Sequence, residues 1–378
     1  MRYILIFFFL SFFLQAQDSL YTRHVIKFLT SEKYYGRGYV KNGLGIAADF
    51  IVGEIKKNKA LPLFGNSYLQ PYSHPVNTFP KKVEVNINGK ILIPGRDFII
   101  NPECPTVKGK FEFIKKDSIH YVSDKSAMLC NIKLSKKLTY SVGISQNKNC
   151  SIEILRSKQT EEIKTAEINI EAEFIPEFKT NNIGTYIEGK NNDSTIVFTA
   201  HYDHLGAMGK GCFFPGANDN ASGTSMVLNL IKYYSVHKPK YKTVFVFFAS
   251  EEAGLIGSHY FVEQNSIDLS KIKFLVNLDL LGTGDDGIMV VNGAVFTKQF
   301  DLLEKINKDE HLIKEIKKRG KAQNSDHYWF TEKGVPSFFI YTLGGVSFYH
   351  DIDDLEKTLP LTDYKDVFKL LIDFANQL

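Results

Sequence analysis

Short apolar segments alternate with amphipathic helical segments in the second half of this chain, from about residue 180 onward. The apolar segments are rich in Val, Phe and Ile and cover residues 194–202, 243–250, 273–280, 287–293 and 336–342. Apolar residues at helical spacing cover 222–237, 297–310 and 362–378. Buried strands that alternate with helices predict an α/β fold, with a mostly parallel central sheet and helices on both of its faces.

The first half of the chain has a different pattern. Residues 43–60 carry apolar side chains at helical spacing and end in lysines, which predicts a helix packed on the core. Residues 61–75 contain several Pro and Gly and predict loops. From 80 to 178, short runs alternate apolar and polar residues, so we expect a β-rich insertion or satellite domain. This region has no convincing cluster of His, Asp or Glu, and we assign no chemistry to it.

The N-terminus indicates where the protein acts. Residues 1–17, MRYILIFFFLSFFLQAQ, have one basic residue, an apolar run and then a small residue, which is the order of a secretory signal peptide. The apolar run is short of the ~20 residues that span a bilayer. We therefore expect an exported protein, periplasmic or extracellular, with no stable membrane span after cleavage.

The charge pattern argues against one class of binding partner, nucleic acid. The formal net charge is +4, and no basic stripe with interleaved aromatic residues occurs, which argues against nucleic acid as a partner. Lysine clusters such as residues 314–321 predict solvated faces.

Four cysteines lie far apart, and none forms a C-x-x-C pair; they are Cys104, Cys130, Cys150 and Cys212. A zinc-thiolate site is therefore not expected. In an exported protein they can form one or two disulfides, with three possible pairings. Isolated thiols packed in the core are the alternative.

Acidic and imidazole side chains follow the predicted strands at the edge where α/β folds bind ligands, outside the carboxyl ends of the strands. They are His201, Asp203, His204, Asp219, Glu251, Glu252, Asp279 and His350. Each of these residues, taken alone, can have a purely structural role. Asp219 can cap the following helix, and Glu251 with Glu252 can form a solvated turn. Together, imidazoles and carboxylates suit divalent zinc. One shared carboxylate can hold two such ions ~3.5–4 Å apart, and a carboxylate free of metal can act as the base.

Six motifs occur in order along the second half of the chain: AHYDHLG, PGANDNASGT, ASEEAGLIGS, NLDLLG, SDHYWF and FYHDIDD. They resemble the motifs of the co-catalytic two-zinc aminopeptidases of clan MH, the group that also contains glutamate carboxypeptidases and glutaminyl cyclases. The earlier segments YYGRGYVKNGLGIAADFIVGEIKK and YLQPY resemble the N-terminal part of the same family. The resemblance covers residues of about 30–75 and 190–378, and it implies the phosphorylase/hydrolase-like zinc aminopeptidase fold.

A division into domains follows from this resemblance. Residues 1–17 form the signal peptide, 18–79 the N-terminal part of the peptidase domain, 80–178 the β-rich insertion and 179–378 the zinc peptidase domain. Many exported relatives carry a protease-associated domain near the position of the insertion, but residues 80–178 have no clear signature of one.

The resemblance also implies a set of metal ligands. His201, Asp219 and Asp279 would bind one Zn²⁺ ion, and Asp219 would bridge to a second ion held by Glu252 and His350. The YHDIDD stretch differs from the commoner His-Thr-x-x-Asp form of the family, but it keeps the histidine at 350.

Three further residues match catalytic positions of the family. Glu251 would be the general base that activates the water between the metals, and Asp203 would orient the imidazole of His201. Tyr349 would stabilise the oxyanion of the tetrahedral intermediate. We expect His204 to be structural, and we derive no chemical role for the remaining matches, Ser325, Asp326 and His327.

These observations predict an exported zinc metallopeptidase, most simply an aminopeptidase that acts on peptides or proteins. A carboxypeptidase or dipeptidase with the same two-zinc site is an alternative, as is a glutaminyl cyclase, which works with one zinc. A binding protein that had lost catalysis would be expected to lack a metal ligand or the general base. The five ligand positions, 201, 219, 252, 279 and 350, and the base position, 251, are all filled here. Side-chain preference and oligomeric state stay open.

Overall fold

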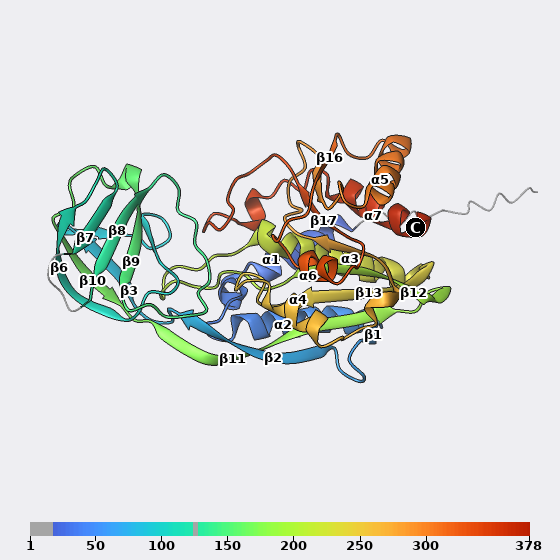
Figure 1. The fold of residues 1–378 in the computed structure, drawn as a ribbon, viewed down its shortest axis with the longest axis horizontal. Coiled ribbons are helices and arrows are strands. Elements are labelled where there is room, and N and C mark those ends of the chain that lie inside the picture. Colours follow the sequence, from blue (N-terminus) through green and yellow to red (C-terminus); the bar gives the residue numbers. More distant parts are fainter. Residues whose placement is uncertain (1–17, 124–127) are drawn as a thin grey trace, which may run out of the picture.

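The computed structural model describes residues 18–123 and 128–378. The predicted signal peptide lies outside these residues. The described chain forms two lobes along its long axis, a large lobe of sheet and helices and a small lobe of strands (Figure 1). No helix in the described part of the chain combines the length and apolar character needed to cross a membrane.

A nine-stranded sheet lies at the centre of the large lobe, as counted over the described residues. Its order is β1-β11-β13-β12-β14-β17-β15-β16, and β2 also pairs with β11. The bounds are β1 (Leu61–Pro62), β2 (Leu69–Thr78), β11 (Glu173–Ile187), β12 (Asn191–His201), β13 (Tyr241–Phe248), β14 (Ile272–Leu278), β15 (Ile288–Val291), β16 (Ile316–Arg319) and β17 (Ser337–Thr342).

Strand directions in this sheet are mixed. The central strands β13, β12, β14 and β17 are parallel to one another. The strand β11 is antiparallel to β13, and β15 is antiparallel to β17. The predicted α/β class is confirmed, whereas the mostly parallel arrangement holds for the centre of the sheet and not for its edges.

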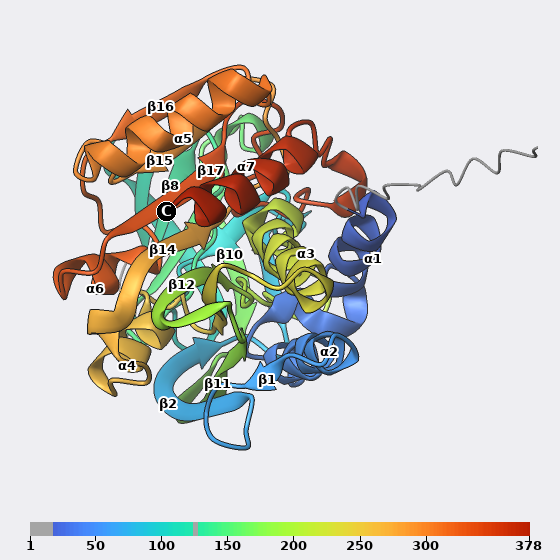
Figure 2. The same cartoon turned by 90° about the vertical axis from the view of Figure 1, so that its right-hand side faces the viewer.

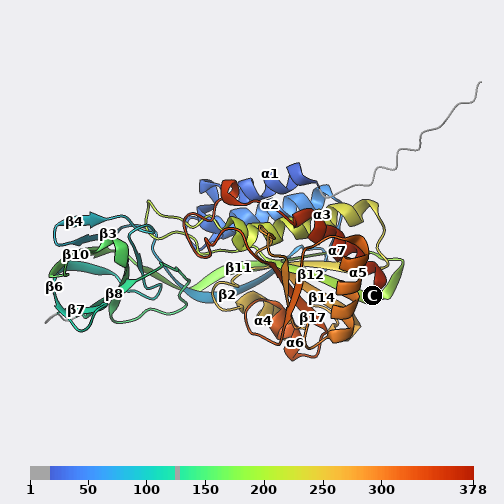
Figure 3. The ribbon, with the colours of Figure 1, turned by 90° about the horizontal axis from the view of Figure 1, so that it is seen from above.

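Helices cover both faces of this sheet, as predicted (Figures 2 and 3). Leu228 of α3 and Leu371 of α7 lie in the core on one face, and Phe261 of α4 and Phe330 of α6 lie in the core on the other. The helices are α1 (Ser19–Leu29), α2 (Gly43–Lys57), α3 (Gly223–Val236), α4 (Ile256–Glu263), α5 (Thr297–Glu310), α6 (His327–Glu332) and α7 (Tyr364–Gln377). Short helical turns are η1 (Glu32–Arg37), η2 (Arg156–Lys158), η3 (Ala217–Ser222), η4 (Leu269–Lys271) and η5 (Glu356–Thr358).

Two segments differ from the sequence-based expectation. The prediction of a loop-rich segment over 61–75 holds for residues 63–68 and is wrong for the rest, because residues 61–62 form β1 and residues 69–75 belong to β2. Apart from a single bridge between Asn77 and Gly143, β2 pairs with β11 alone in the described part of the chain. Such an edge strand tolerates proline, which has no N–H to donate to a neighbour. The lysine-rich residues 316–319 are exposed, as expected, but they also form the terminal strand β16. Charged side chains on such an edge oppose pairing with another chain.

The small lobe is an eight-stranded sheet, counted over the described residues, in the order β4-β3-β10-β6-β7-β8-β9-β5. The bounds are β3 (Val83–Ile87), β4 (Lys90–Leu92), β5 (Phe98–Ile100), β6 (Val107–Lys115), β7 (His120–Ser123), β8 (Cys130–Ser135), β9 (Cys150–Leu155) and β10 (Thr165–Ile170). Its core includes Leu205, Met208 and Phe214, which follow β12 of the large lobe. The two lobes therefore share apolar contacts next to the end of a central strand.

All four cysteines are buried as free thiols, the alternative to disulfides that the sequence left open. They lie in the core of the small lobe.

Arg37 ties the N-terminal segment to the central strands. Its side chain is fully buried, and its guanidinium donates to the carbonyl oxygens of Leu29 (3.3 Å), Tyr202 (2.9 Å), Pro215 (2.6 Å), Gly216 (2.8 Å) and Asp219 (3.1 Å). Five acceptors around one planar group match the donor capacity of arginine. Arg37 thus fixes the loop that carries Asp219.

We expect Arg37→Lys to lower the free energy of unfolding by about 3 kcal/mol, because an ammonium group has three donors and leaves buried carbonyls unpaired. Urea unfolding of the two proteins measures this. Arg23→Lys is the matched control, since Arg23 is 37% exposed and pairs with Glu356 at 3.1 Å; it should cost less than about 1 kcal/mol. Equal losses in both variants would contradict the role given to Arg37.

Candidate metal centre

Three adjacent parallel strands bring the predicted site residues to one edge of the large sheet. The strand β12 ends at His201, β13 ends just before Glu251 and Glu252, and β14 ends just before Asp279. Because β13, β12 and β14 are neighbours and parallel, their carboxyl ends meet. The remaining residues come from the turn η3, which holds Asp219, and from the loop after β17, which holds His350.

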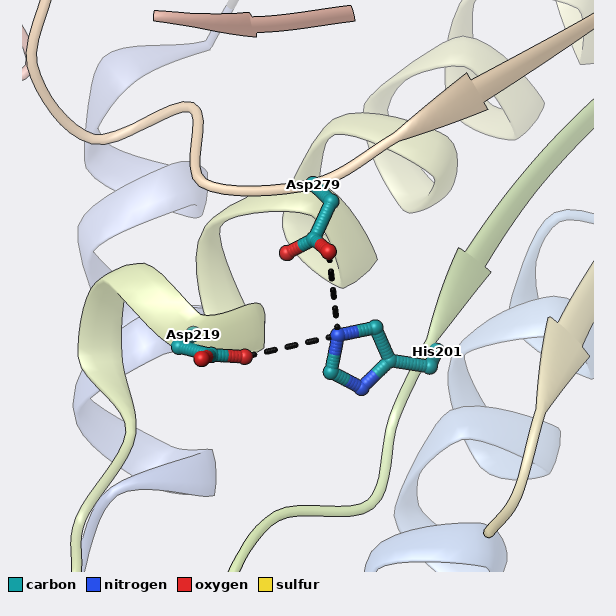
Figure 4. A group of neighbouring side chains, drawn as sticks. All are labelled: His201, Asp219 and Asp279. Carbon is teal, nitrogen blue, oxygen red and sulfur yellow. Dashed lines mark ion pairs between the residues drawn. The ribbon is translucent and has the colours of Figure 1, made fainter. Parts of the chain in front are cut away.

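His201, Asp219 and Asp279 form a buried cluster (Figure 4). The Nε2 atom of His201 lies 3.4 Å from an Oδ atom of Asp219 and 3.4 Å from an Oδ atom of Asp279. One ligand atom from each residue lies within 4.8 Å of the others. These three side chains can therefore hold a metal ion together.

A second group lies on the other side of Asp219. The Nε2 atom of His350 lies 3.3 Å from Asp219 Oδ2 and 3.1 Å from Glu252 Oε2. His201 faces Oδ1 of Asp219, whereas His350 faces Oδ2. The two oxygens of one carboxylate thus point to two different imidazoles, which is the arrangement that a bridging ligand requires.

His204 lies inside this second group. Its Nδ1 atom is 2.7 Å from Glu252 Oε1 and 3.8 Å from Asp219 Oδ1. It is fully buried, and with Asp219 and Glu252 it forms a set that could hold a metal. The sequence indicated only a structural residue here, but the structure gives His204 a direct contact with a predicted metal ligand.

Asp203 contacts the turn that follows β13. Its carboxylate accepts hydrogen bonds from the backbone N–H groups of Glu251 (3.2 Å) and Glu252 (3.3 Å). The nearer carboxylate oxygen is 3.7 Å from His201 Nδ1, which is longer than a hydrogen bond; the backbone carbonyl of Asp203 is nearer, at 3.3 Å. Asp203 therefore fixes the two glutamates more directly than the imidazole it was predicted to orient.

Two orienting groups were missed by the sequence analysis. Asp354 accepts hydrogen bonds from the backbone N–H groups of Asn218 and Asp219 at 2.9–3.0 Å. The carbonyl oxygen of Tyr140, in the insertion, lies 2.7 Å from His350 Nδ1. A carbonyl only accepts, so Nδ1 carries the proton and Nε2 is left free to bind a metal. Asp354 lies within the quoted FYHDIDD motif, but a backbone contact such as that of Tyr140 leaves no signal in the sequence.

Ser325 forms a hydrogen bond with one predicted metal ligand, Asp279. It accepts a hydrogen bond from Asn277 Nδ2 (2.8 Å) and donates to Asp279 Oδ2 (3.3 Å). Asp326 and His327 are also buried. The SDHYWF motif thus contributes a side chain that holds Asp279, a role that the sequence did not indicate.

Glu251, His201, Asp219, Glu252 and Asp279 line one cavity of about 200 Å³. Within the described residues, the Glu251 carboxylate has no cationic partner within 4 Å. Burial raises its pKa well above the usual value. Burial also acts on Asp219, but contacts with His201 and His350 hold the pKa of that carboxyl well below its usual value. Two neighbouring carboxylates thus have pKa values shifted in opposite directions, that of Glu251 upward and that of Asp219 downward.

Tyr349 lies at the mouth of the same cavity. Its ring stacks on that of His350, with 3.8 Å between the ring centroids, and 48% of the residue is exposed. The hydroxyl therefore belongs to a side chain that a bound molecule can reach.

Comparisons with known proteins show which proteins this chain is similar to. A "probable leucine aminopeptidase 2" of Aspergillus oryzae is 24% identical over 269 residues, covering 62% of this chain and 52% of that protein. Aminopeptidase YwaD of Bacillus subtilis is 30% identical over 153 residues, covering 38% of this chain and 30% of that protein. The chain therefore matches about half or less of the length of these curated relatives.

A solved structure, the zinc aminopeptidase BSAP from Bacillus subtilis, has a similar fold with a TM-score of 0.68 at 16% identity, over 96% of this chain and 95% of that one. The model of peptidase family M28 matches residues 182–375, which contain every predicted metal ligand and the predicted base. The chain belongs to peptidase family M28.

Proposed function

We propose that this protein is a zinc-dependent aminopeptidase that holds two Zn²⁺ ions and hydrolyses N-terminal peptide bonds. The spacing of the ligand atoms carries the proposal. Two atoms that each lie 2.0–2.1 Å from a tetrahedral zinc ion are about 3.3 Å apart. The distances from the Nε2 atoms of His201 and His350 to the carboxylates that they face are 3.1–3.4 Å. Each pair therefore has the separation of two ligands of one ion.

The donor set also fits zinc. His201, Asp219 and Asp279 would hold one ion, and Asp219, Glu252 and His350 the other. The buried atoms Asp279 Oδ1 and His350 Nε2 have no hydrogen-bond partner, which is costly unless another ligand satisfies them. When bound, zinc lowers the pKa of water and polarises a carbonyl group.

Glu251 is the acid–base residue of the proposed reaction. Its carboxylate faces the cavity without a cationic partner in the described chain, and its raised pKa makes it a better proton acceptor. It takes a proton from the attacking water and delivers it to the leaving amine. Asp203 holds Glu251 in place through the backbone, and the Tyr349 hydroxyl donates to the substrate carbonyl oxygen as negative charge develops there.

The aminopeptidase assignment rests on the relatives, both of which carry that activity in their names. A carboxypeptidase or dipeptidase would use the same ligands, so the substrate decides among them. A one-zinc glutaminyl cyclase is favoured less, because both oxygens of Asp219 face an imidazole. Export through residues 1–17 belongs to the same proposal, and N-terminal sequencing of the protein recovered from its native cells tests it.

Glu251→Gln should lower kcat by about 10²–10⁴-fold, because the amide cannot accept the proton, and it should keep the metal content of the wild type. The assay is hydrolysis of a panel of aminoacyl-anilides, with free and with blocked amines. An aminopeptidase cleaves only the free-amino substrates. If the wild-type protein binds two zinc ions but cleaves neither the free nor the blocked anilides, the aminopeptidase assignment is excluded and a carboxypeptidase or dipeptidase is left.

Asp219→Ala should abolish binding of both ions, whereas His350→Ala should keep about one, since only Asp219 contacts both groups. Atomic absorption on dialysed protein counts the zinc in each variant. A wild-type protein with a single zinc ion would favour the cyclase over the two-zinc peptidase.

Asp203→Asn should weaken zinc binding or activity by about 10–100-fold, the usual cost of losing a group that orients ligands. The amide keeps one acceptor oxygen for the two backbone N–H groups of Glu251 and Glu252. Zinc titration and anilide hydrolysis measure the effect. Asp193→Asn, an exposed change in β12, is the control and should leave both values unchanged; wild-type values for Asp203→Asn would argue against its positioning role.

A further inference from the structure

The insertion contains a basic pocket, defined here by Lys133, Lys136, Lys137, Glu153 and Arg156. These residues line a cavity of about 530 Å³ at the ends of β8 and β9. Four of them are cationic and one is acidic. All four cations are exposed, so a ligand from solvent can reach them.

The positive charge of the basic pocket is only partly neutralised. Lys133 pairs with Glu153 at 3.6 Å, and Glu153 also accepts a hydrogen bond from Ser135 at 2.6 Å. Within the described residues, Lys136 and Arg156 have no carboxylate within 4 Å, and Lys137 donates to a backbone carbonyl instead. A concave surface with uncompensated positive charge concentrates anionic groups.

A segment that lines this pocket contacts the loop that carries His350 of the candidate metal centre. Lys137 Nζ donates to the carbonyl oxygen of Ser347 at 3.1 Å, and Ser347 is two residues before Tyr349, a span of at most about 7 Å. Thr139 of the cavity wall directly precedes Tyr140, whose carbonyl oxygen lies 2.7 Å from His350 Nδ1. One short segment of the insertion, residues 137–140, therefore contacts the loop of the metal centre at two points.

We propose that the basic pocket binds carboxylate groups of a peptide substrate, downstream of the bond that is cut at the metal centre. This rests on the proposed aminopeptidase function, in which the amino end of the peptide lies in the cavity and the rest extends outward. By way of Ser347, Lys137 Nζ lies within about 10 Å of Tyr349. An extended peptide advances about 3.4 Å per residue, so roughly three residues downstream cover that span. Acidic side chains at those positions reach the basic pocket, and the enzyme prefers peptides that carry them.

The test uses peptides of about eight residues with an N-terminal Leu and an amidated C-terminus, carrying either Glu or Gln after the third residue. A third peptide has Gln and a free C-terminal carboxylate. It tests whether the pocket binds the carboxylate of an acidic side chain or that of the peptide's C-terminus. At low salt, kcat/KM for the Glu peptide should exceed that for the Gln peptide by about five- to tenfold, and the ratio should fall toward one as salt screens the charges.

The variant Lys136→Gln/Arg156→Gln should remove this preference and leave hydrolysis of leucine anilide unchanged. The matched control is Lys115→Gln/Lys116→Gln, which removes the same charge from an exposed part of the insertion outside the pocket and should keep the preference. Equal kcat/KM for Glu and Gln peptides, or a preference that survives in the pocket variant, overturns the proposal.

Direct binding separates this inference from the proposed function. Fluorescence anisotropy of the labelled Glu and Gln peptides with Glu251→Gln measures the pocket without turnover. Tighter binding of the Glu peptide than of the Gln peptide, lost in the pocket variant, supports the basic pocket. This holds even if the wild-type protein does not hydrolyse leucine anilide, because missing hydrolysis counts against the aminopeptidase assignment alone. Equal binding of the two peptides overturns the basic pocket whatever the hydrolysis result.

Discussion

Four carboxylates gathered in one place, two of them buried and two half-buried, are the constraint on which this structure depends. Asp219, Glu251, Glu252 and Asp279 line one cavity, and their mutual repulsion in a water-poor site is large unless cations balance it. Three imidazoles, of His201, His204 and His350, lie against these carboxylates. The cluster has the composition of a metal site, because divalent ions offset such charge more completely than imidazoles do.

The backbone around this cluster is held by groups that do not touch the cavity. Arg37 binds five carbonyl oxygens, including that of Asp219, and Asp354 binds the N–H groups of Asn218 and Asp219. Asp203 does the same for Glu251 and Glu252. Both the N–H and the carbonyl group of Asp219 are therefore hydrogen-bonded, as are the N–H groups of Glu251 and Glu252. These bonds limit how far the predicted ligands can move apart.

The small lobe contacts the candidate site. The carbonyl oxygen of Tyr140 fixes the tautomer of His350, and the segment around it contacts the loop of the candidate metal centre and lines the basic pocket. A region to which the sequence assigned no chemistry therefore contacts the candidate metal centre directly.

The sequence by itself determined the α/β class, the positions of the helices α2, α3, α5 and α7 and of the central strands, and the residues that meet at the strand ends, whereas it did not indicate α1, α4 or α6. These follow from local periodicity and from the rule that parallel strands end at one edge. Tertiary structure decided the rest: the antiparallel edges of the sheet, the strand β2, the contact of His204 with Glu252, the sharing of Asp219 between two imidazoles and the contact of Tyr140 with His350. The physical reason is that these features are contacts between segments far apart in the chain, and several are made by backbone atoms. Side-chain identity along the sequence carries no record of them.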